Sequence, residues 1–548
     1  MINMLDKKTK NKNSTKLFFS GVLVLTITNL LVKFIGLMFK IPMHGIIGDE
    51  GMGYYNSAYT FYTYLYMVST AGLPTAISIM ISDSRANRQI KQVKRIFHIS
   101  LLLFIVIGII STMIMFFGAG LMSTAIGAAP TRYSIMAIAP TLLFICITSS
   151  LRGYFQGYQQ MIPTAISQFL EAAAKLGVGI AFALYAKNLG YGVHIQAAYA
   201  TVGLTTGALA GMLCMVIAKM FFKEKQYDAQ FIEDAGENDE ITPAGALLKK
   251  LLIIALPITV SASVMSLTNL IDAAIVQRLL QSTGLSQVSA TELYGNYTSL
   301  AVPMFNLPPV LIYPISYSIV PLLAAAKKRG DTEKCRVVTE SSMRVAMLVG
   351  IPCGLGLSAL SRPILAMLFR DSSSVSLAAP LLTLLAPSTA FICILSVSNA
   401  ILQSAGFERK PLVSMLAGAV VKIVTNFVLI QYIGMKSTPI STFLCYLTVT
   451  SLNLYFIKKH VGIMPRLSGL FGKPLLAGAA CAATAYFVFS MISSIISDKI
   501  AVVGAIGAAG IVYLIVLFLI KGISGDDIRM LPKGEKIYGI FKKLRLVK

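Results

Sequence analysis

Long apolar blocks set what this chain of 548 residues can fold into. The segment Leu17–Phe39 is interrupted by one charged residue, Lys33, and the segments Ile96–Met122, Ala197–Phe222 and Ala501–Ile520 are similarly apolar. A helix of about 20 apolar residues crosses a bilayer and satisfies its own backbone hydrogen bonds within the lipid. Only 13% of the residues are charged, whereas a soluble protein carries about a quarter. The sequence therefore predicts an all-α integral membrane protein.

The apolar blocks predict about fourteen membrane-spanning helices. The expected spans are 17–41, 54–82, 96–122, 131–156, 163–186, 194–222, 247–277, 296–325, 337–360, 377–404, 411–433, 438–458, 471–496 and 500–521. They divide the chain into a basic tail (1–16), an N-terminal lobe (17–222), an acidic linker (223–246), a C-terminal lobe (247–458), two further spans (471–521) and a second basic tail (522–548). The first apolar block is too long for a signal peptide, so we expect it to be retained as a span.

The positions of Lys and Arg predict the orientation of the spans. They are dense in the N-terminal tail and in alternate connections, around residues 85–95, 223–225, 249–250, 327–336, 409–410 and 458–473. The other connections hold scattered cations, namely Arg132, Lys187, Arg362, Arg370, Lys436 and Lys499. Because cytoplasmic loops carry the excess of Lys and Arg, we expect both termini to be cytoplasmic. A basic, amphipathic stretch at 537–548 is compatible with a helix on the inner leaflet or with a solvated tail.

Several classes of function have little support. The net charge is +24, but the cations lie in short loops where they orient helices and meet anionic lipid, so no nucleic-acid partner is expected. Six of the seven cysteines fall inside apolar blocks, and neither Cys nor His shows ligand spacing, so no metal site is expected. Because no nucleotide-binding or hydrolase motif occurs in the sequence, an enzyme is not expected.

An internal repeat relates the two lobes. At an offset of 240, Thr28-Asn29-Leu30 matches Thr268-Asn269-Leu270 and Pro74 matches Pro314, and at an offset of 247, Lys175 matches Lys422. Six helices per copy is an even number, so the copies share one orientation. This predicts two six-helix lobes related by an axis along the membrane normal, with a cavity between them and alternating access by rocking. The last two helices lie outside the repeat.

Glycine and proline predict local features of the spans. Gly72-Leu73-Pro74 predicts a kink within the second span. Gly203, Gly207 and Gly211 are spaced four apart, which indicates close helix packing rather than a functional site.

Ionisable side chains within spans are the candidate site residues, because they are costly in lipid and usually face a cavity. The candidate substrate-binding cations are Lys33, Arg152, Lys175 and Lys422. The candidate acids, for ion coupling or for a salt bridge, are Asp272 and Glu171.

Structural roles stay open for most of these residues. Glu171 and Lys175 lie four apart on one helix face and can neutralise each other. Lys33 can pair with Asp272 between helices, and Arg152 can extend to the cytoplasmic interface.

A surplus of cations favours an anionic substrate such as a phosphate or pyrophosphate head group, whose lost water Lys and Arg would replace. Energy would come from ions, the membrane potential or the substrate gradient. Each charge moved across the membrane corresponds to about 2.3 kcal/mol per 100 mV. No cofactor is expected, and Na⁺ or H⁺ coupling stays open.

The segment Leu151–Gly157, followed by Pro163–Gln168 and Glu171, resembles the stage V sporulation protein B-like branch of polysaccharide transporters. The segments Gly51–Tyr55, Gly72–Ser78 and Asn399–Gln403 are similar to that branch too. It belongs to the multidrug/oligosaccharidyl-lipid/polysaccharide exporter superfamily, which includes the lipid II flippases, and the resemblance covers the full length. It implies two six-helix lobes, alternating access and export of an undecaprenyl-pyrophosphate-linked sugar across a bacterial cytoplasmic membrane.

This sequence departs from one pattern of the family. Proteobacterial lipid II flippases carry Arg-x-x-Gly-x-x-Arg in helix one. Here Lys33-Phe34-Ile35-Gly36 matches the first half, Phe39 occupies the second cationic position, and Lys40 follows. The cavity cations that those relatives carry in helices two and eight are not found here, which puts the substrate or its binding residues in doubt.

Three functions compete on the sequence. A flippase for a lipid-linked cell-wall precursor agrees best with the cations and the resemblance, and it implies anionic lipids and cell-wall synthesis proteins as further partners. A cation-coupled multidrug exporter of the same superfamily would favour an acidic cavity. A non-transporting scaffold in envelope or spore-cortex assembly would not need intramembrane charges such as Lys33 and Lys422.

Overall fold

The computed structural model describes residues 2–224, 242–369, 372–463, 468–520, 522–525, 527 and 539. Within these ranges every regular element is a helix, which confirms the all-α prediction. Most of the acidic linker predicted at 223–246 and, apart from residue 539, the amphipathic stretch predicted at 537–548 lie outside the described residues.

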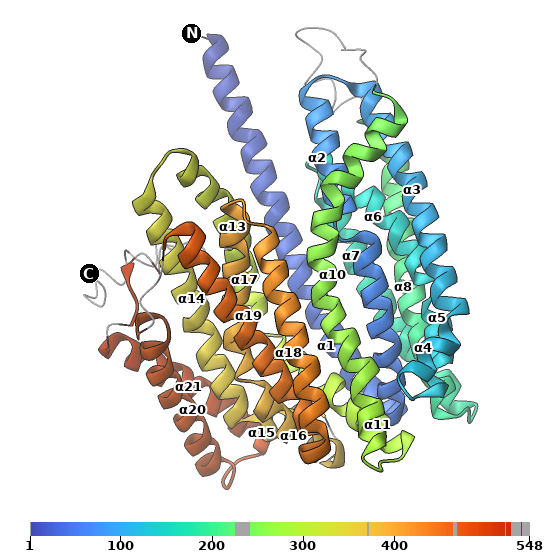
Figure 1. Ribbon diagram of the computed structural model, residues 1–548, viewed down its shortest axis with the longest axis vertical. Coiled ribbons are helices and arrows are strands. Elements are labelled where there is room, and N and C mark those ends of the chain that lie inside the picture. The colour runs from blue at the N-terminus through green and yellow to red at the C-terminus, as the bar shows by residue number, and fades with distance from the viewer. Residues whose placement is uncertain are drawn as a thin grey trace. The chain divides into compact units, whose positions relative to one another are not determined.

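The chain divides into two compact units, Met1–Ala274 and Ile275–Lys548. The first unit contains α1 (Ile2–Thr70), α2 (Leu73–Ala86), α3 (Ile90–Phe117), α4 (Ala119–Ala125), η1 (Ala129–Thr131), α5 (Arg132–Ile138), α6 (Thr141–Gly157), α7 (Ile162–Asn188), α8 (Val193–Phe221) and most of α10 (Ala244–Ser282). The division falls inside α10, beyond the predicted linker. Within this unit α7 packs along α8, and α3 packs against α6 (Figure 1).

The second unit holds the remaining helices. They are α11 (Gln287–Asn296), η2 (Tyr297–Ala301), α12 (Val302–Phe305), α13 (Pro309–Lys328), α14 (Thr332–Ala359), α15 (Ser361–Leu368), α16 (Ser372–Leu385), α17 (Ser388–Ser404), α18 (Arg409–Ile433), η3 (Gly434–Lys436), α19 (Ser437–Val461), η4 (Ser468–Gly472), α20 (Lys473–Ile492) and α21 (Asp498–Leu519). Within this unit α18 packs along α19, and α14 packs against α17 and α20.

The helices are long and apolar enough for a multi-span membrane protein. In the described ranges, nine helical stretches can cross a membrane, or up to eleven if two bent pairs each form one span. Two of the nine, Ile27–Ala86 and Arg409–Val461, contain 60 and 53 residues. At about 1.5 Å per residue, each has room for two crossings of a hydrocarbon core about 30 Å thick. Large apolar side chains such as Ile110, Val420 and Ile515 are exposed, as expected for surfaces that meet lipid.

Two glycines determine where the first spans bend. The predicted gap at 42–53 is helical apart from Gly48, whose φ of 68° is a left-handed conformation that glycine adopts without steric cost. The kink predicted at Gly72-Leu73-Pro74 is present, because α1 ends at Thr70 and α2 begins at Leu73. A Cβ on Gly72 would lie 2.1 Å from the Ala255 carbonyl oxygen, so this break also lets α10 approach.

The helix lengths repeat between the units, in agreement with the predicted internal repeat. Helices α3 and α14 each contain 28 residues, and α6 and α17 each contain 17. The bounds of α6, shifted by the offset of 247 found in the sequence, are those of α17. The folding pattern of one unit therefore recurs in the other.

The predicted close packing of the α8 glycines is confirmed. A Cβ on Gly203 would lie 2.4 Å from the Cα of Gly179, and one on Gly207 would lie 2.6 Å from the carbonyl oxygen of Glu171. Since no larger residue has space there, these glycines let the backbone of α8 come close to α7. This packing fixes the helix that carries Glu171 and Lys175.

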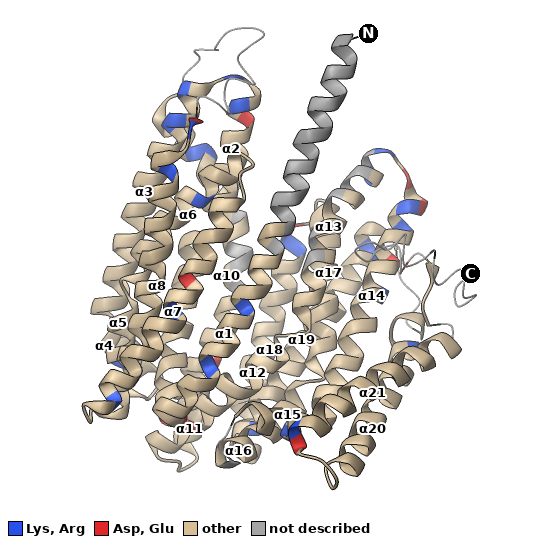
Figure 2. Cartoon of the chain, turned by 180° about the vertical axis from the view of Figure 1, so that it is seen from behind, with Lys and Arg blue, Asp and Glu red and all other residues tan. Residues whose placement is uncertain are grey.

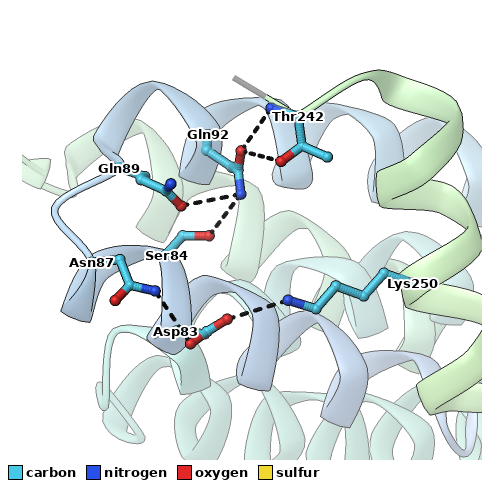
Figure 3. A network of polar contacts seen from close by, with 7 residues as sticks. All are labelled: Asp83, Ser84, Asn87, Gln89, Gln92, Thr242 and Lys250. Carbon is cyan, nitrogen blue, oxygen red and sulfur yellow. Dashed lines mark hydrogen bonds and ion pairs between the residues drawn. The ribbon is translucent and has the colours of Figure 1, made fainter. Parts of the chain in front are cut away.

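A polar network ties the start of α10 to the turn between α2 and α3 (Figure 3). The Gln92 side-chain oxygen accepts hydrogen bonds from the Thr242 backbone N–H at 3.0 Å and from its hydroxyl at 2.9 Å. Lys250 on α10 forms an exposed ion pair with Asp83 on α2 at 3.3 Å. Figure 2 shows Lys and Arg gathered at this end of the first unit, which the charge pattern predicts to be cytoplasmic.

Candidate functional site

A polar cavity of about 240 Å³ lies among the helices of the first unit. Its walls come from both halves of α1 and from α6, α7 and α8. The lining residues are Asn29, Val32, Ile35, Gly36, Phe39, Tyr59, Tyr62, Tyr66, Thr141, Arg152, Gln168, Glu171, Ala172, Lys175 and Leu204. Two cations and one carboxylate are among them, so the cavity carries a net positive formal charge.

Arg152 and Glu171 form an ion pair in the wall of this cavity. The Arg152 guanidinium donates to the Glu171 carboxylate at 3.0 Å and to the Ser167 hydroxyl at 3.1 Å. Ser167 and Glu171 lie four apart and hence on one face of α7, which presents both to Arg152 on α6. The side chains are only 13% and 29% exposed. Arg152 is therefore engaged at the cavity, which favours the cavity role over extension to the interface.

Lys175 is held by aromatic rings. Its Nζ lies 5.0 Å from the centre of the Phe39 ring and 5.3 Å from that of Tyr59. A ring face attracts an ammonium group without removing its charge. Within the described part of the chain, no ion pair joins Lys175 to Glu171. The local neutralisation left open by their spacing is therefore replaced by the pairing of Glu171 with Arg152.

Four tyrosines form a row along the second half of α1. The ring centroids lie 6.3 Å apart for Tyr55 and Tyr59, 5.7 Å for Tyr59 and Tyr62, and 6.0 Å for Tyr62 and Tyr66. The last three line the cavity. Sequence analysis missed them, although their spacing of three and four residues places them on one helix face. They give the cavity ring faces and hydroxyl groups beside its charges.

Gln168 contributes an acceptor. Its side-chain oxygen is buried and has no hydrogen-bond partner among the residues that the structure describes. A buried acceptor of this kind is costly unless a donor reaches it. The cavity thus offers cations, ring faces and at least one hydrogen-bond acceptor to a bound group.

The other three predicted site residues lie outside this cavity. Lys33 is an exposed residue of α1, next to the lining residue Val32. Asp272 on α10 is buried in the first unit, at 6% exposure. Lys422 is buried in the second unit, at 4% exposure, on the face of α18 that also carries Gly418 and Asn426. The structure thus brings together Arg152, Lys175 and Glu171, and the roles of the other three stay predictions.

The sequence pattern of the polysaccharide biosynthesis protein family matches residues 18–327, which is more than half of the chain. The chain belongs to the polysaccharide biosynthesis protein family. The pattern of the MatE family also matches residues 257–428. The predicted resemblance is therefore confirmed.

Two relatives align with most of this chain. Stage V sporulation protein B of Bacillus subtilis (strain 168) is 26% identical over 524 residues, covering 94% of this chain and 98% of that protein. Lipid II flippase MurJ of the same organism is 24% identical over 453 residues, covering 81% of this chain and 82% of that protein.

A solved structure has the same fold. Lipid II flippase MurJ in an inward closed conformation superposes with a TM-score of 0.67 at 14% identity, covering 91% of this chain and 98% of that one. Together with the family matches, this makes the chain a multi-span membrane transporter of the multidrug/oligosaccharidyl-lipid/polysaccharide exporter superfamily, and not an enzyme.

Proposed function

We propose that this transporter is a flippase that moves an undecaprenyl-pyrophosphate-linked cell-wall precursor from the inner to the outer leaflet of a bacterial cytoplasmic membrane. The observation that carries the proposal is the net-cationic cavity of the first unit, where Arg152 and Lys175 outnumber Glu171. The relative named lipid II flippase supports a lipid-linked substrate.

The two cations have different roles in this proposal. Arg152 already bonds to Glu171, so it holds the cavity wall together. The Lys175 ammonium is held by ring faces and keeps its N–H donors for a phosphate oxygen. Ligand pockets usually measure about 300–1,000 Å³. A cavity of about 240 Å³ thus suits one charged group of the head, with the sugars and the lipid chain outside it.

Release requires that the phosphate leave the lysine when the transporter opens outward. An anionic head leaving a negative-inside cell gains about 2.3 kcal/mol per charge per 100 mV. The membrane potential can therefore favour release, with H⁺ or Na⁺ coupling through Asp272 or Glu171 as a further source of energy. In the cell, anionic lipids would surround this protein, and cell-wall synthesis proteins would supply and use its substrate.

Reconstituted vesicles test the proposal directly. We would measure transfer of lipid II, and of a second undecaprenyl-pyrophosphate-linked oligosaccharide, to the opposite leaflet for the wild type, Lys175→Ala and Lys187→Ala. Lys187 is the matched control because it is on the same helix and its Nζ donates to the Ile46 carbonyl at an exposed position.

Transfer by the wild type and Lys187→Ala, with at least tenfold slower transfer by Lys175→Ala, would support the proposal. Transfer of the second oligosaccharide alone would support a flippase function and exclude lipid II as the substrate. Equal rates for all three proteins, or no transfer of either lipid together with potential-dependent export of a cationic dye, would contradict it. The second result would favour a multidrug exporter.

A further inference from the structure

An open pocket of about 740 Å³ lies within the second unit, distinct from the cavity that carries the proposed function. It is formed by α15, α16, the end of α18, η3 and the start of α19. We call it the outer pocket, because these connections are predicted to be on the external side. Its volume lies within the range of about 300–1,000 Å³ that is usual for ligand sites.

Two cations line the outer pocket. Arg362 and Lys436 are both exposed lining residues, and among the described residues no acidic side chain lines the pocket with them. Within the described residues, neither has an ion pair or hydrogen bond. The external cations of the first unit are different, since Arg132 donates to the Tyr133 hydroxyl at 2.7 Å and Lys187 donates to the Ile46 carbonyl at 2.8 Å.

The rest of the wall is apolar or already satisfied. Leu384, Ile433 and Ile440 supply apolar surface. The hydroxyls of Ser361 and Thr383 are hydrogen-bonded to each other at 2.7 Å. An apolar wall with two unpaired cations matches a ligand that is apolar over most of its length and negative at one end.

We propose that the outer pocket binds a lipid whose phosphate gives its head group a net negative charge, as in phosphatidylglycerol. Arg362 and Lys436 would pair with the phosphate, and the first part of the lipid chain would lie against Ile433 and Ile440. The position agrees with this ligand, because α16 and α18 belong to predicted spans that end near the outer interface. At a membrane interface, each Lys or Arg raises the local concentration of anionic lipid about fivefold.

The chain has no tryptophan, which makes a site-specific test possible. We would introduce a single tryptophan by Ile433→Trp and reconstitute the full chain in phosphatidylcholine vesicles. Brominated phosphatidylglycerol or brominated phosphatidylcholine then quenches the tryptophan emission wherever the lipid is in contact. Val424→Trp, at an exposed position about two and a half turns earlier on α18, reports ordinary surrounding lipid. The assay needs no transport, so its failure is separate from failure of the proposed function.

Phosphatidylglycerol should quench the Ile433→Trp protein at about tenfold lower mole fraction than phosphatidylcholine, with no such preference in the Val424→Trp protein. Adding Arg362→Gln and Lys436→Gln should abolish the preference, whereas adding Arg132→Gln and Lys187→Gln should leave it. Equal quenching at the two tryptophan positions, or a preference that survives Arg362→Gln with Lys436→Gln, would overturn the proposal. Loss of the preference in millimolar inorganic phosphate, at constant ionic strength, would show that the pocket takes free phosphate and would overturn the lipid assignment.

Discussion

Arg152 on α6 and Glu171 on α7 are joined by a hydrogen-bonded ion pair of 3.0 Å in the wall of the first-unit cavity. Among the described residues that line the cavity, Glu171 carries the one carboxylate, and the pair commits it to the guanidinium. The Lys175 ammonium instead lies against two rings. One cation therefore stabilises the packing of two helices, and the other carries the positive charge of the cavity. Because packing and charge rest on different residues, substitutions can separate them.

Glu171→Gln should destabilise the protein by about 1–3 kcal/mol. Breaking a fully buried ion pair costs about 3–5 kcal/mol, and this pair is partly exposed, so the cost is smaller. The free energy of unfolding in detergent micelles measures it. Glu333→Gln, which removes an exposed carboxylate paired with Arg336, is the control and should cost clearly less, because water screens that pair. Similar losses for the two variants would show that the Arg152 pair is not a structural contact.

Tyr59→Leu should weaken the hold on Lys175, whereas Tyr59→Phe should keep it, because the ring face rather than the hydroxyl contacts the ammonium. A contact of this kind is worth about 0.5–2 kcal/mol. A double-mutant cycle of Tyr59→Leu with Lys175→Met should give a coupling energy in that range, and a cycle with Tyr59→Phe should give about zero. Equal coupling for Leu and Phe would contradict the ring contact.

The sequence was sufficient for the helical multi-span fold, the repeat and the α8 packing, because each depends on residue type and spacing along the chain. The sequence was not sufficient to predict which side chains form ion pairs with one another. Glu171 and Lys175 are four apart, which suggests a local pair, yet the Arg152 side chain reaches Glu171 from the neighbouring helix. Whether Glu171 pairs with Lys175 or with Arg152 depends on the directions in which side chains of neighbouring helices point. The row from Tyr55 to Tyr66 could have been recognised from its helical spacing, but not that it lines a cavity.

Gly207→Ala should be destabilising by about 1–3 kcal/mol, because the new Cβ would lie 2.6 Å from the Glu171 carbonyl oxygen and push α8 away from α7. Gly177→Ala on α7 is the matched control, since no atom lies within 4 Å of its Cβ position. Alanine there should stabilise the helix by about 0.5–1 kcal/mol. Thermal unfolding of both variants distinguishes the two outcomes, and a stabilised Gly207→Ala protein would refute the packing argument.

Gln92→Leu should loosen the start of α10, because it removes the acceptor for both the backbone N–H and the hydroxyl of Thr242 (Figure 3). An unsatisfied donor costs about 1–3 kcal/mol when it is buried, and Thr242 is half-buried, so we expect a cost at the lower end. Amide hydrogen exchange in the first turns of α10 should therefore accelerate by about fivefold or more. Lys250→Gln breaks only the exposed pair with Asp83 and should change exchange little. Unchanged exchange in Gln92→Leu would mean that the network does not hold α10.

Glu224, which lies outside the predicted spans, should make the stability of the protein depend on pH. Burial alone would raise the pKa of its carboxyl group, but hydrogen bonds from Lys219 and Tyr154 and the charges of Lys219 and Lys94 outweigh burial and lower the pKa. A carboxyl group whose pKa is lowered by folding adds stability above its unfolded pKa, which is about 4.3 for Glu. That stability is lost as the pH falls through the lowered folded value. The difference in melting temperature between the wild type and Glu224→Gln should therefore be constant from pH 7 to about 5 and shrink below about pH 4. A difference that grows on acidification would show that burial outweighs the two hydrogen bonds.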